Sequence, residues 1–287
     1  MTRFFKLSGG GNDFLALAEP DAANIADTAN AANTTPPPER IRAWCRRGVS
    51  LGADGLFILR RLPAGVEMDY FNADGYPADL CLNGTRCAAQ LAFHLGWETD
   101  RVGVQTGAGL VSAQRIDAER VRLALPAPAV PTEISVTIDG TTCAGYRVLV
   151  GVPHFVMQWE DLERAPVQVL GAALRHHAVF APGGTNVNFV RYPNRHRMEV
   201  RTFERGVENE TLACGSGMLA STAVGLALGA LEMPVRVLTR GGFELEVDIA
   251  DIDQEADRWS LAGDARVVAE GTLLPSAAVE PAPPAWR

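Results

Sequence analysis

Two short segments of this 287-residue chain each place a cysteine directly before residues that favour a tight turn. The first, residues 81–84, reads Cys-Leu-Asn-Gly, and the second, residues 214–217, reads Cys-Gly-Ser-Gly. A run of helical composition follows each one, over residues 85–97 and 218–231. At a helix N-terminus, unpaired backbone N–H groups and the helix dipole favour a thiolate and also bind anions. The pair therefore predicts a carboxylate held between two helix ends, with one sulfur on either side.

Alternatively, the same cysteines could have only a structural role. Cysteine is among the most buried residue types, and a Cys-x-Asn/Ser-Gly segment can simply be a turn that enters a helix. One copy alone would favour this reading. Two copies, one in each half of the chain, favour a paired function.

The composition indicates a globular protein of two domains. Apolar residues make up 47% and charged residues 21%, and the net charge is −8. An acidic surface argues against nucleic-acid and anionic-membrane partners. The uncharged stretch at 212–231 is predicted to be a buried helix, because it contains several glycines and hydroxyl residues. We expect a cytoplasmic protein with reduced thiols, since the N-terminus has no signal-like apolar core.

Metal and cofactor sites are not expected. The five cysteines form no Cys-x2-Cys pair, which argues against zinc, and no lysine lies in a pyridoxal-phosphate-like motif. The early glycine cluster at 9–11 lacks the pattern of a phosphate loop and is predicted to be a hairpin turn.

The pattern along the chain predicts two similar halves, each with many strands and one central helix. The N-terminal domain is expected over residues 1–126, with a surface loop at 19–39, and the C-terminal domain over 127–265. Proline-rich residues 126–131 are the predicted linker. Two short strands, 266–268 and 272–274, are expected to return to the first domain within 266–276, and residues 277–287 to form a frayed tail.

Several motifs, in this order, resemble those of the diaminopimelate epimerase family. They extend over nearly the whole chain and are highly specific as a set. They are Phe71-Asn72-Ala73-Asp74-Gly75, Cys81-Leu82-Asn83-Gly84-Thr85-Arg86-Cys87, Gly151-Val152-Pro153-His154, Thr185-Asn186-Val187, Glu204-Arg205-Gly206 and Glu210-Thr211-Leu212-Ala213-Cys214-Gly215-Ser216-Gly217.

The resemblance implies a mixed α/β (α+β) fold of two domains related by a pseudo-twofold axis. Each domain would be a barrel-like sheet around a central helix. It also implies cofactor-independent conversion of LL-2,6-diaminopimelate to meso-diaminopimelate, a step of lysine and cell-wall precursor biosynthesis. A small amino-acid substrate is the expected partner, and a homodimer is left open.

Catalytic roles follow from the resemblance together with the chemistry. Cys81 and Cys214 would be the base and the acid on opposite faces of the α-carbon, a task that suits a thiolate/thiol pair near neutral pH. By analogy, His154 would assist Cys81 and Glu204 would assist Cys214. A histidine after a proline can instead be a satisfied core residue.

Substrate contacts are assigned in the same way. The backbone N–H groups around Leu82, Asn83 and Gly84, and around Gly215, Ser216 and Gly217, would bind the carboxylate at the reacting carbon. By analogy, Asn12, Asn72, Asn186 and Arg205 would hold the rest of the substrate. Arg205 suits a two-point carboxylate contact at the far end. The asparagines can instead satisfy turns, above all Asn72.

Three residues depart from the usual pattern of the family. Ser8 stands where a histidine is usual, Leu82 where a glycine is usual and Val152 where an asparagine is usual. Loss of one polar partner costs about 1–3 kcal/mol when the opposing group stays unpaired. A racemase or epimerase of another amino acid is therefore the alternative within the enzymes.

Outside that class, two further functions stay open. Cys81 and Cys214 could form a reversible disulfide in a thiol redox sensor, or the chain could be an amino-acid-binding protein. Proline racemases share the paired-cysteine logic, but the sequence around their cysteines reads differently.

Overall fold

The computed structural model describes residues 2–19, 35–250 and 258–278. Most of the predicted loop at 19–39 and most of the predicted tail at 277–287 lie outside these residues. The chain divides into two compact units. Unit 1 comprises Met1–Val121 and Asp264–Arg287, and unit 2 comprises Arg122–Gly263. The predicted divisions, after residues 126 and 265, lie a few residues further along the chain.

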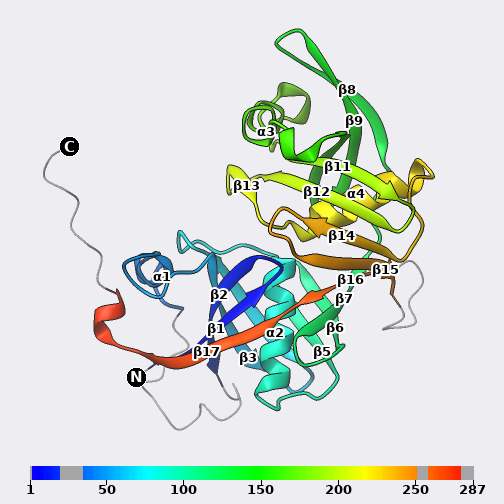
Figure 1. The fold of residues 1–287 in the computed structure, drawn as a ribbon. Coiled ribbons are helices and arrows are strands. Elements are labelled where there is room, and N and C mark those ends of the chain that lie inside the picture. Colours follow the sequence, from blue (N-terminus) through cyan, green and yellow to red (C-terminus); the bar gives the residue numbers. More distant parts are fainter. Residues whose placement is uncertain (1, 20–34, 251–257, 279–287) are drawn as a thin grey trace, which may run out of the picture. The chain divides into compact units, whose positions relative to one another are not determined.

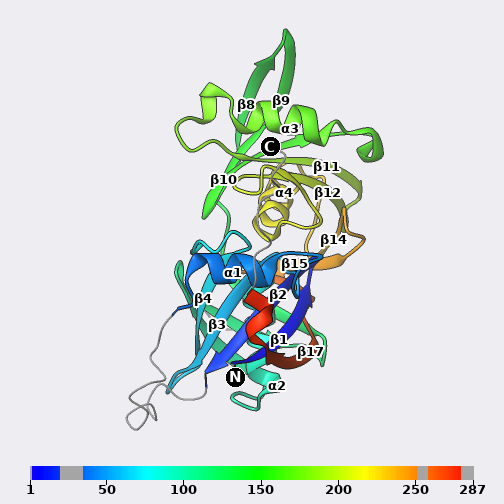
Figure 2. The ribbon, with the colours of Figure 1, turned by 90° about the vertical axis from the view of Figure 1, so that its left-hand side faces the viewer.

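Unit 1 is a sheet that surrounds one helix. Its strands are β1 (Thr2–Gly9), β2 (Asn12–Glu19), β3 (Gly55–Arg61), β4 (Val66–Asn72), β5 (Arg101–Thr106), β6 (Gly109–Arg115) and β17 (Arg266–Leu273), and β7 (Arg120–Pro126) leads into unit 2. Helix α2 (Leu82–His94) contacts β1 to β6 and β17, and its residues 82–93 are all buried. Helix α1 (Pro38–Cys45) packs on the other side of β2 and β3 (Figure 2).

Unit 2 has the same plan. Its strands are β8 (Thr132–Ile138), β9 (Thr141–Val150), β10 (Val152–Gln158), β11 (Asn186–Asn194), β12 (Arg197–Glu204), β13 (Asn209–Thr211), β14 (Val235–Thr239), β15 (Glu244–Ile249) and β16 (Arg258–Asp264). Helix α4 (Gly215–Ala227) lies within this unit (Figure 1) and contacts β9 to β12 and β15. Helix α3 (Val167–Arg175) lies against β11 and β12, and the described 3-10 turns of this unit are Leu162–Arg164 and Ala178–Phe180. A further 3-10 turn, Pro275–Ala278, follows β17 in unit 1.

The two sheets repeat one strand order. In unit 1 the order is β17-β1-β2-β3-β4-β5-β6, and in unit 2 it is β8-β9-β10-β11-β12-β14-β15. Both orders have parallel pairs at the same two places, β2–β3 and β4–β5 in one, β10–β11 and β12–β14 in the other. Parallel neighbours need a long crossover, and each of these four crossovers contains a helix. The second crossover of each unit contains the helix that follows a motif cysteine.

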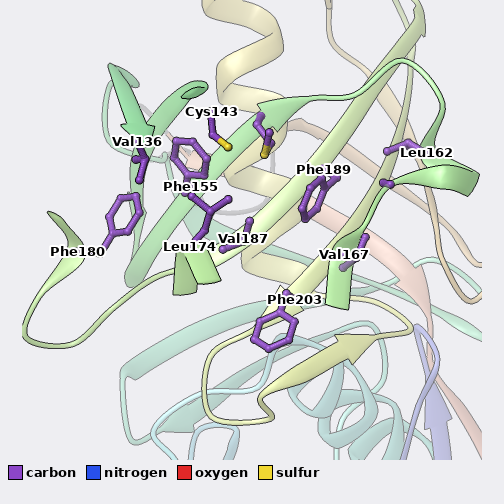
Figure 3. Close-up of a cluster of buried hydrophobic side chains, with 12 residues drawn as sticks. Val136, Cys143, Phe155, Leu162, Val167, Leu174, Phe180, Val187, Phe189 and Phe203 are labelled. Carbon is purple, nitrogen blue, oxygen red and sulfur yellow. The ribbon is translucent and has the colours of Figure 1, made fainter. Parts of the chain in front are cut away.

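Apolar layers fix α1 and α3 on their sheets. A cluster in unit 2 joins Phe155 and Phe189 of the sheet to Val167 and Leu174 of α3, with Phe203 beside it (Figure 3). In unit 1, Ile41 and Trp44 of α1 pack on Leu15, Leu56 and Ile58. Strand β3 is therefore buried on both faces, which explains its unbroken apolar run, Leu56-Phe57-Ile58-Leu59.

Most predicted elements are present, with three differences. The two central helices begin about one turn earlier than predicted, at Leu82 and Gly215 instead of residues 85 and 218. Helix α3 is not among the predicted elements. The two short strands expected at 266–268 and 272–274 are one strand, β17, because Gly271 lies opposite Phe4 inside the ladder, and a Cβ there would lie 2.9 Å from the Phe4 ring.

The stretch predicted to be a buried helix contains α4, which has only 13 residues. None of the helices in the described part of the chain combines the length and apolar character that crossing a bilayer requires.

We predict that Gly171→Ala destabilises the protein, although alanine is the better helix former by about 1 kcal/mol. A Cβ at Gly171 would lie 2.6 Å from the Cβ of Phe203, so α3 must shift from its sheet. Overpacking of this kind costs about 1–3 kcal/mol. The free energy of unfolding in urea measures the effect.

The control is Val169→Ala on the same helix, where the side chain is 77% exposed. This change should stabilise by about 0.5 kcal/mol, because only helix propensity changes. If Gly171→Ala also raised the free energy of unfolding, α3 would not pack tightly on β12.

Candidate active site

Both motif cysteines occupy the residue directly before a central helix. Cys81 has φ −134° and ψ 107°, and Cys214 has φ −126° and ψ 109°. Their carbonyl oxygens accept the first helical hydrogen bonds, from Thr85 N at 2.7 Å and from Met218 N at 3.0 Å. The two side chains therefore stand at equivalent helix N-termini, one in each unit, where the first-turn amides have no acceptor within their own helix.

The Cys81 sulfur accepts a hydrogen bond from one of these amides, Gly84 N, at 3.5 Å. Space beside Gly84 is limited, because a Cβ there would lie 3.1 Å from the terminal methyl of Met68 and 3.6 Å from the Cys81 sulfur. Leu82 and Asn83 are buried in the same first turn. The segment 82–84 thus places a backbone amide against the sulfur.

A chain of side-chain hydrogen bonds supports this half of the site. The Arg86 guanidinium donates to Asn83 Oδ1 at 2.6 Å, Asn83 Nδ2 donates to Asn12 Oδ1 at 2.7 Å, and Asn12 Nδ2 donates to Asp54 at 3.0 Å. Each amide is oriented by its neighbour, since a guanidinium only donates and a carboxylate only accepts. Arg86 is fully buried and also donates to the Asp264 carbonyl.

Cys214 has a different partner, the carboxylate of Glu204. Its thiol is hydrogen-bonded to Glu204, whose Oε2 also accepts from Thr211 Oγ1 at 3.0 Å. Ser216 Oγ lies 3.6 Å from the Cys214 sulfur. Burial raises the pKa of the Glu204 carboxyl above its ordinary value, against the two hydrogen bonds, which lower it. A raised pKa makes this carboxylate a better acceptor for the thiol proton.

His154 is completely buried in unit 2 and is neutral. Burial and the charge of Arg205 lower its pKa to about 3. Asn188 Nδ2 lies 3.1 Å from His154 Nδ1 and 3.2 Å from the Phe155 carbonyl, and Asn188 Oδ1 accepts from Thr202. Since Asn188 donates, Nδ1 accepts, and the ring proton is on Nε2. That N–H is buried and has no hydrogen-bond partner among the described residues.

Asn188 is a site residue that sequence reasoning missed. It faces the same side of β11 as Asn186, two residues earlier, and both asparagines are buried. A Cβ at Gly217 would overlap Asn188 Oδ1, so the glycine in the second cysteine motif admits this side chain. The sequence pattern that could have predicted Asn188 is the pair of asparagines at alternate positions of an otherwise apolar strand, where both side chains point to the same face and need hydrogen-bond partners.

Asn186 and Arg205 are brought together in unit 2. Asn186 Oδ1 accepts from the Arg205 backbone N at 2.8 Å, and its Nδ2 donates to the Pro153 carbonyl at 3.3 Å. Asn186 therefore positions the backbone that carries Arg205. In unit 1, Asn72 is exposed at the end of β4, where its backbone closes a turn with Gly75 and Tyr76.

The predicted site residues thus form two groups, each described within its own unit. Unit 1 holds Asn12, Asn72, Cys81, Leu82, Asn83 and Gly84. Unit 2 holds His154, Asn186, Glu204, Arg205, Cys214, Gly215 and Ser216. None of the five cysteines is in a disulfide.

The other three cysteines have the environment of inert thiols. Burial raises the pKa of Cys45 to about 12 and raises the pKa of Cys87 and of Cys143 above its ordinary value. Reactive cysteines need access and a group that favours the thiolate. In the described residues no three His, Cys, Asp or Glu side chains form a group that could bind a metal.

The three departures from the usual family pattern lie at defined places. Ser8 lies in β1 with its Oγ 3.4 Å from Arg266 Nη2, Leu82 is the first residue of α2, and Val152 is the first residue of β10.

Solved structures share this two-unit fold. A phenazine biosynthesis protein of the PhzF family from Enterococcus faecalis matches with a TM-score of 0.67 and 15% identity, over 95% of this chain and 99% of its own. A hydroxyproline epimerase from Agrobacterium vitis, with bound trans-4-hydroxy-L-proline, has a TM-score of 0.62 and 14% identity, over 94% and 91%. The fold class is therefore the one that these proteins share.

Sequence comparison identifies the family within that class. The family model for diaminopimelate epimerase matches residues 4–125 and 146–268. The diaminopimelate epimerase of Aquifex aeolicus is 38% identical over 276 residues, which are 94% of this chain and 97% of the relative. The chain belongs to the diaminopimelate epimerase family, a family of isomerases.

We predict that acid weakens the fold through His154. Its pKa is depressed on folding, from an ordinary value near 6.5 to about 3. The unfolded chain therefore binds the extra proton between these values, and stability falls as pH drops from about 6.5 toward 3. One group of this kind changes the free energy of unfolding by at most about 1.4 kcal/mol per pH unit.

Urea unfolding of the wild type and of His154→Gln at several pH values between 4 and 8 measures this slope. The slope of the variant should be smaller by the contribution of one proton. Equal slopes in the two proteins would show that His154 is not buried in its neutral form.

Proposed function

We propose that this chain converts LL-2,6-diaminopimelate to meso-diaminopimelate by moving a proton between two thiols, without a cofactor. The observation that carries the proposal is the repeat. Two units of one strand order each place a cysteine before their central helix, in a chain 38% identical to a diaminopimelate epimerase. Support for a pair comes from this equivalence, since each unit supplies one thiol at the residue directly before its central helix.

Inversion of an α-carbon needs a base on one face and an acid on the other. A thiolate at one cysteine takes the α-proton, and the thiol of the other gives a proton to the opposite face. The roles exchange when the substrate has the other configuration. Thiols suit both roles near neutral pH, because their pKa is close to the working pH.

The carbanion needs stabilisation, because a proton beside a carboxylate is only weakly acidic. The first-turn amides at 82–84 and 215–217 are donors that suit a carboxylate, and the positive ends of α2 and α4 favour negative charge. Donors fixed in place before the reaction act as in an oxyanion hole, where one donor contributes about 3–4 kcal/mol.

Glu204 and His154 assist in different ways. Glu204 accepts the Cys214 proton through their hydrogen bond and so generates the thiolate. His154 is neutral and offers its Nε2–H, so it serves as a donor that stabilises negative charge rather than as a base. We assign this donor to Cys81 and the substrate bound beside it.

The far end of the substrate carries an amine and a second carboxylate. We assign Arg205 to that carboxylate, with Asn72 as a further contact and Asn186 holding the Arg205 backbone. Asn12, fixed between Asn83 and Asp54, is assigned to the substrate in unit 1. Leu82 and Val152 are apolar residues at positions where the family usually has glycine and asparagine, so fewer polar groups are left to bind the substrate. This favours one alternative, an epimerase of another amino acid.

Thiol chemistry also requires a reducing compartment, because a disulfide between Cys81 and Cys214 would remove both the base and the acid. We therefore place the enzyme in the cytoplasm. Formation of a homodimer stays a prediction.

We predict that the reduced protein incorporates solvent deuterium at the α-carbon of LL-diaminopimelate in D2O and produces the meso isomer. Cys81→Ala and Cys214→Ala should each reduce epimerisation by about 10²–10⁴-fold, the usual contribution of a positioned acid or base. NMR of the α-proton and chiral chromatography measure both quantities.

Cys143→Ala is the matched control, because this thiol is buried in the apolar cluster that packs α3 on its sheet. Exchange that persists in both motif variants would end the two-thiol mechanism. Exchange only with some other amino acid would keep the mechanism and change the substrate. No exchange with any amino acid would favour a redox sensor or a binding protein.

We predict that Glu204→Gln slows exchange by roughly ten- to a hundred-fold and removes one acid limb of the pH–rate profile. The carboxylate form is the proton acceptor, so activity falls as pH drops through the Glu204 pKa. Burial raises that pKa, so the limb lies at higher pH than for an ordinary glutamate. Stopped-time exchange measurements from pH 4.5 to 9 give the profile.

Glu199→Gln, on the same strand but paired with Arg191, should leave the profile unchanged. If the acid limb were identical in the wild type and in Glu204→Gln, it would belong to the titration of another group.

A further inference from the structure

Glu208 has a strained backbone in the loop that carries two proposed site residues. The loop follows Glu204 and Arg205, and Glu208 has φ +57°. Among the described residues other than glycine, only Asp139, in a hairpin, also has positive φ. This conformation is strained for a residue other than glycine and persists where surrounding contacts enforce it.

The contacts that enforce it converge on the Glu208 carboxylate. Oε1 accepts from the Gly206 backbone N at 2.9 Å and from Arg175 Nε at 3.1 Å, and Oε2 lies 3.1 Å from His176 Nε2. The Glu208 backbone N donates to the Glu204 carbonyl at 2.9 Å. Partial burial tends to raise the pKa of this carboxyl, but the Gly206 amide and the Arg175 charge lower it below its ordinary value.

Arg175 connects this loop to the end of helix α3. It is the last residue of α3, and its side chain is only 13% exposed. Besides Glu208 it binds the Gly183 carbonyl at 3.3 Å. A Cβ on Gly183 would lie 3.4 Å from Arg205 Nη1, so the Arg205 guanidinium lies close to Gly183. Arg175 thus contacts both segments beside Arg205, namely Gly183 and the turn closed by Glu208.

Arg205 is held from the other side by Asn186, which accepts its backbone N–H. The Arg205 side chain is attached to a peptide segment whose two N–H groups, at 205 and 206, each bind a fixed carbonyl or carboxylate oxygen. A shift of this segment would move the guanidinium. A planar two-point contact with a carboxylate depends strongly on such placement.

We propose that Glu208 and Arg175 are a positioning pair that sets the Arg205 guanidinium and thereby the preference for a substrate with a second carboxylate. This inference rests on the proposed function, in which Arg205 binds the far end of diaminopimelate. Neither Glu208 nor Arg175 contacts the reacting carbon in this proposal. Their effect is on substrate binding and on the choice between substrates.

The test measures α-deuterium exchange with LL-diaminopimelate for the wild type, Glu208→Ala, Arg175→Ala and the double variant. Each single change should raise KM at least tenfold and lower kcat by a smaller factor, because a remote binding contact is weakened. The double variant should lose no more kcat/KM than the worse single variant, because either single change already breaks the Glu208–Arg175 pair. Losses that multiply would show that the residues act separately and would overturn the pair.

Glu208→Gly separates positioning from folding. Glycine adopts positive φ without strain, so this variant should keep or raise the unfolding temperature and still raise KM. Glu208→Gln retains an acceptor for the Gly206 N–H and should recover part of the loss. A folded Glu208→Gly protein with wild-type KM would overturn the proposal.

L-Lysine is the matched probe, because it is diaminopimelate without the second carboxylate. Glu208→Ala should reduce the ratio of kcat/KM for diaminopimelate to that for lysine, and a retained ratio contradicts the proposal. Glu199→Ala breaks a comparable ion pair, with Arg191, and should change neither constant. An inactive wild type would overturn the proposed function itself, whereas unaltered Glu208 variants in an active background would overturn only this inference.

Discussion

The first turn of a helix is the constraint on which this structure depends. Its amides have no partner within the helix, so a group placed against them must accept hydrogen bonds or tolerate their positive field. The fold produces two such ends by geometry, because neighbouring parallel strands need a crossover and each crossover holds a helix. A cysteine directly before each central helix uses this property twice. Barrel strands then bury the helices, so the amides beside each sulfur are held rigidly.

Local pattern was sufficient for much of the fold and for the motif residues. The hairpin at Gly10 and Gly11, the strands and the central helices have signatures within a few neighbours. Helix α3 has none, since Val167 and Gly171 are poor helix formers and Pro166 provides no capping side chain. Its stability comes from contacts with strands far along the chain. The start of α2 at Leu82 was also obscured, because Asn-Gly normally predicts a turn rather than a first helical turn.

Properties of the site that depend on tertiary contacts could not be predicted. The sequence indicated His154 as a candidate, but its neutral state follows from complete burial and the hydrogen bond from Asn188. Glu208 gives no signal in its own neighbourhood, since its main partner, Arg175, lies 33 residues earlier in the chain. Asn186 has an obvious motif, and the structure adds that both of its amide atoms bind backbone. A sequence motif therefore identifies a candidate residue, but it does not predict which neighbour that residue is hydrogen-bonded to.

The repeat of strand order has a consequence for the two motif sulfurs. The same topology places a cysteine before the central helix of each unit, but the partners of the two sulfurs differ. The Cys81 sulfur accepts a hydrogen bond from a backbone amide, whereas the Cys214 thiol is hydrogen-bonded to a carboxylate. An equivalent place in a repeated topology therefore does not make the two thiols chemically equivalent, because one faces a donor and the other an acceptor.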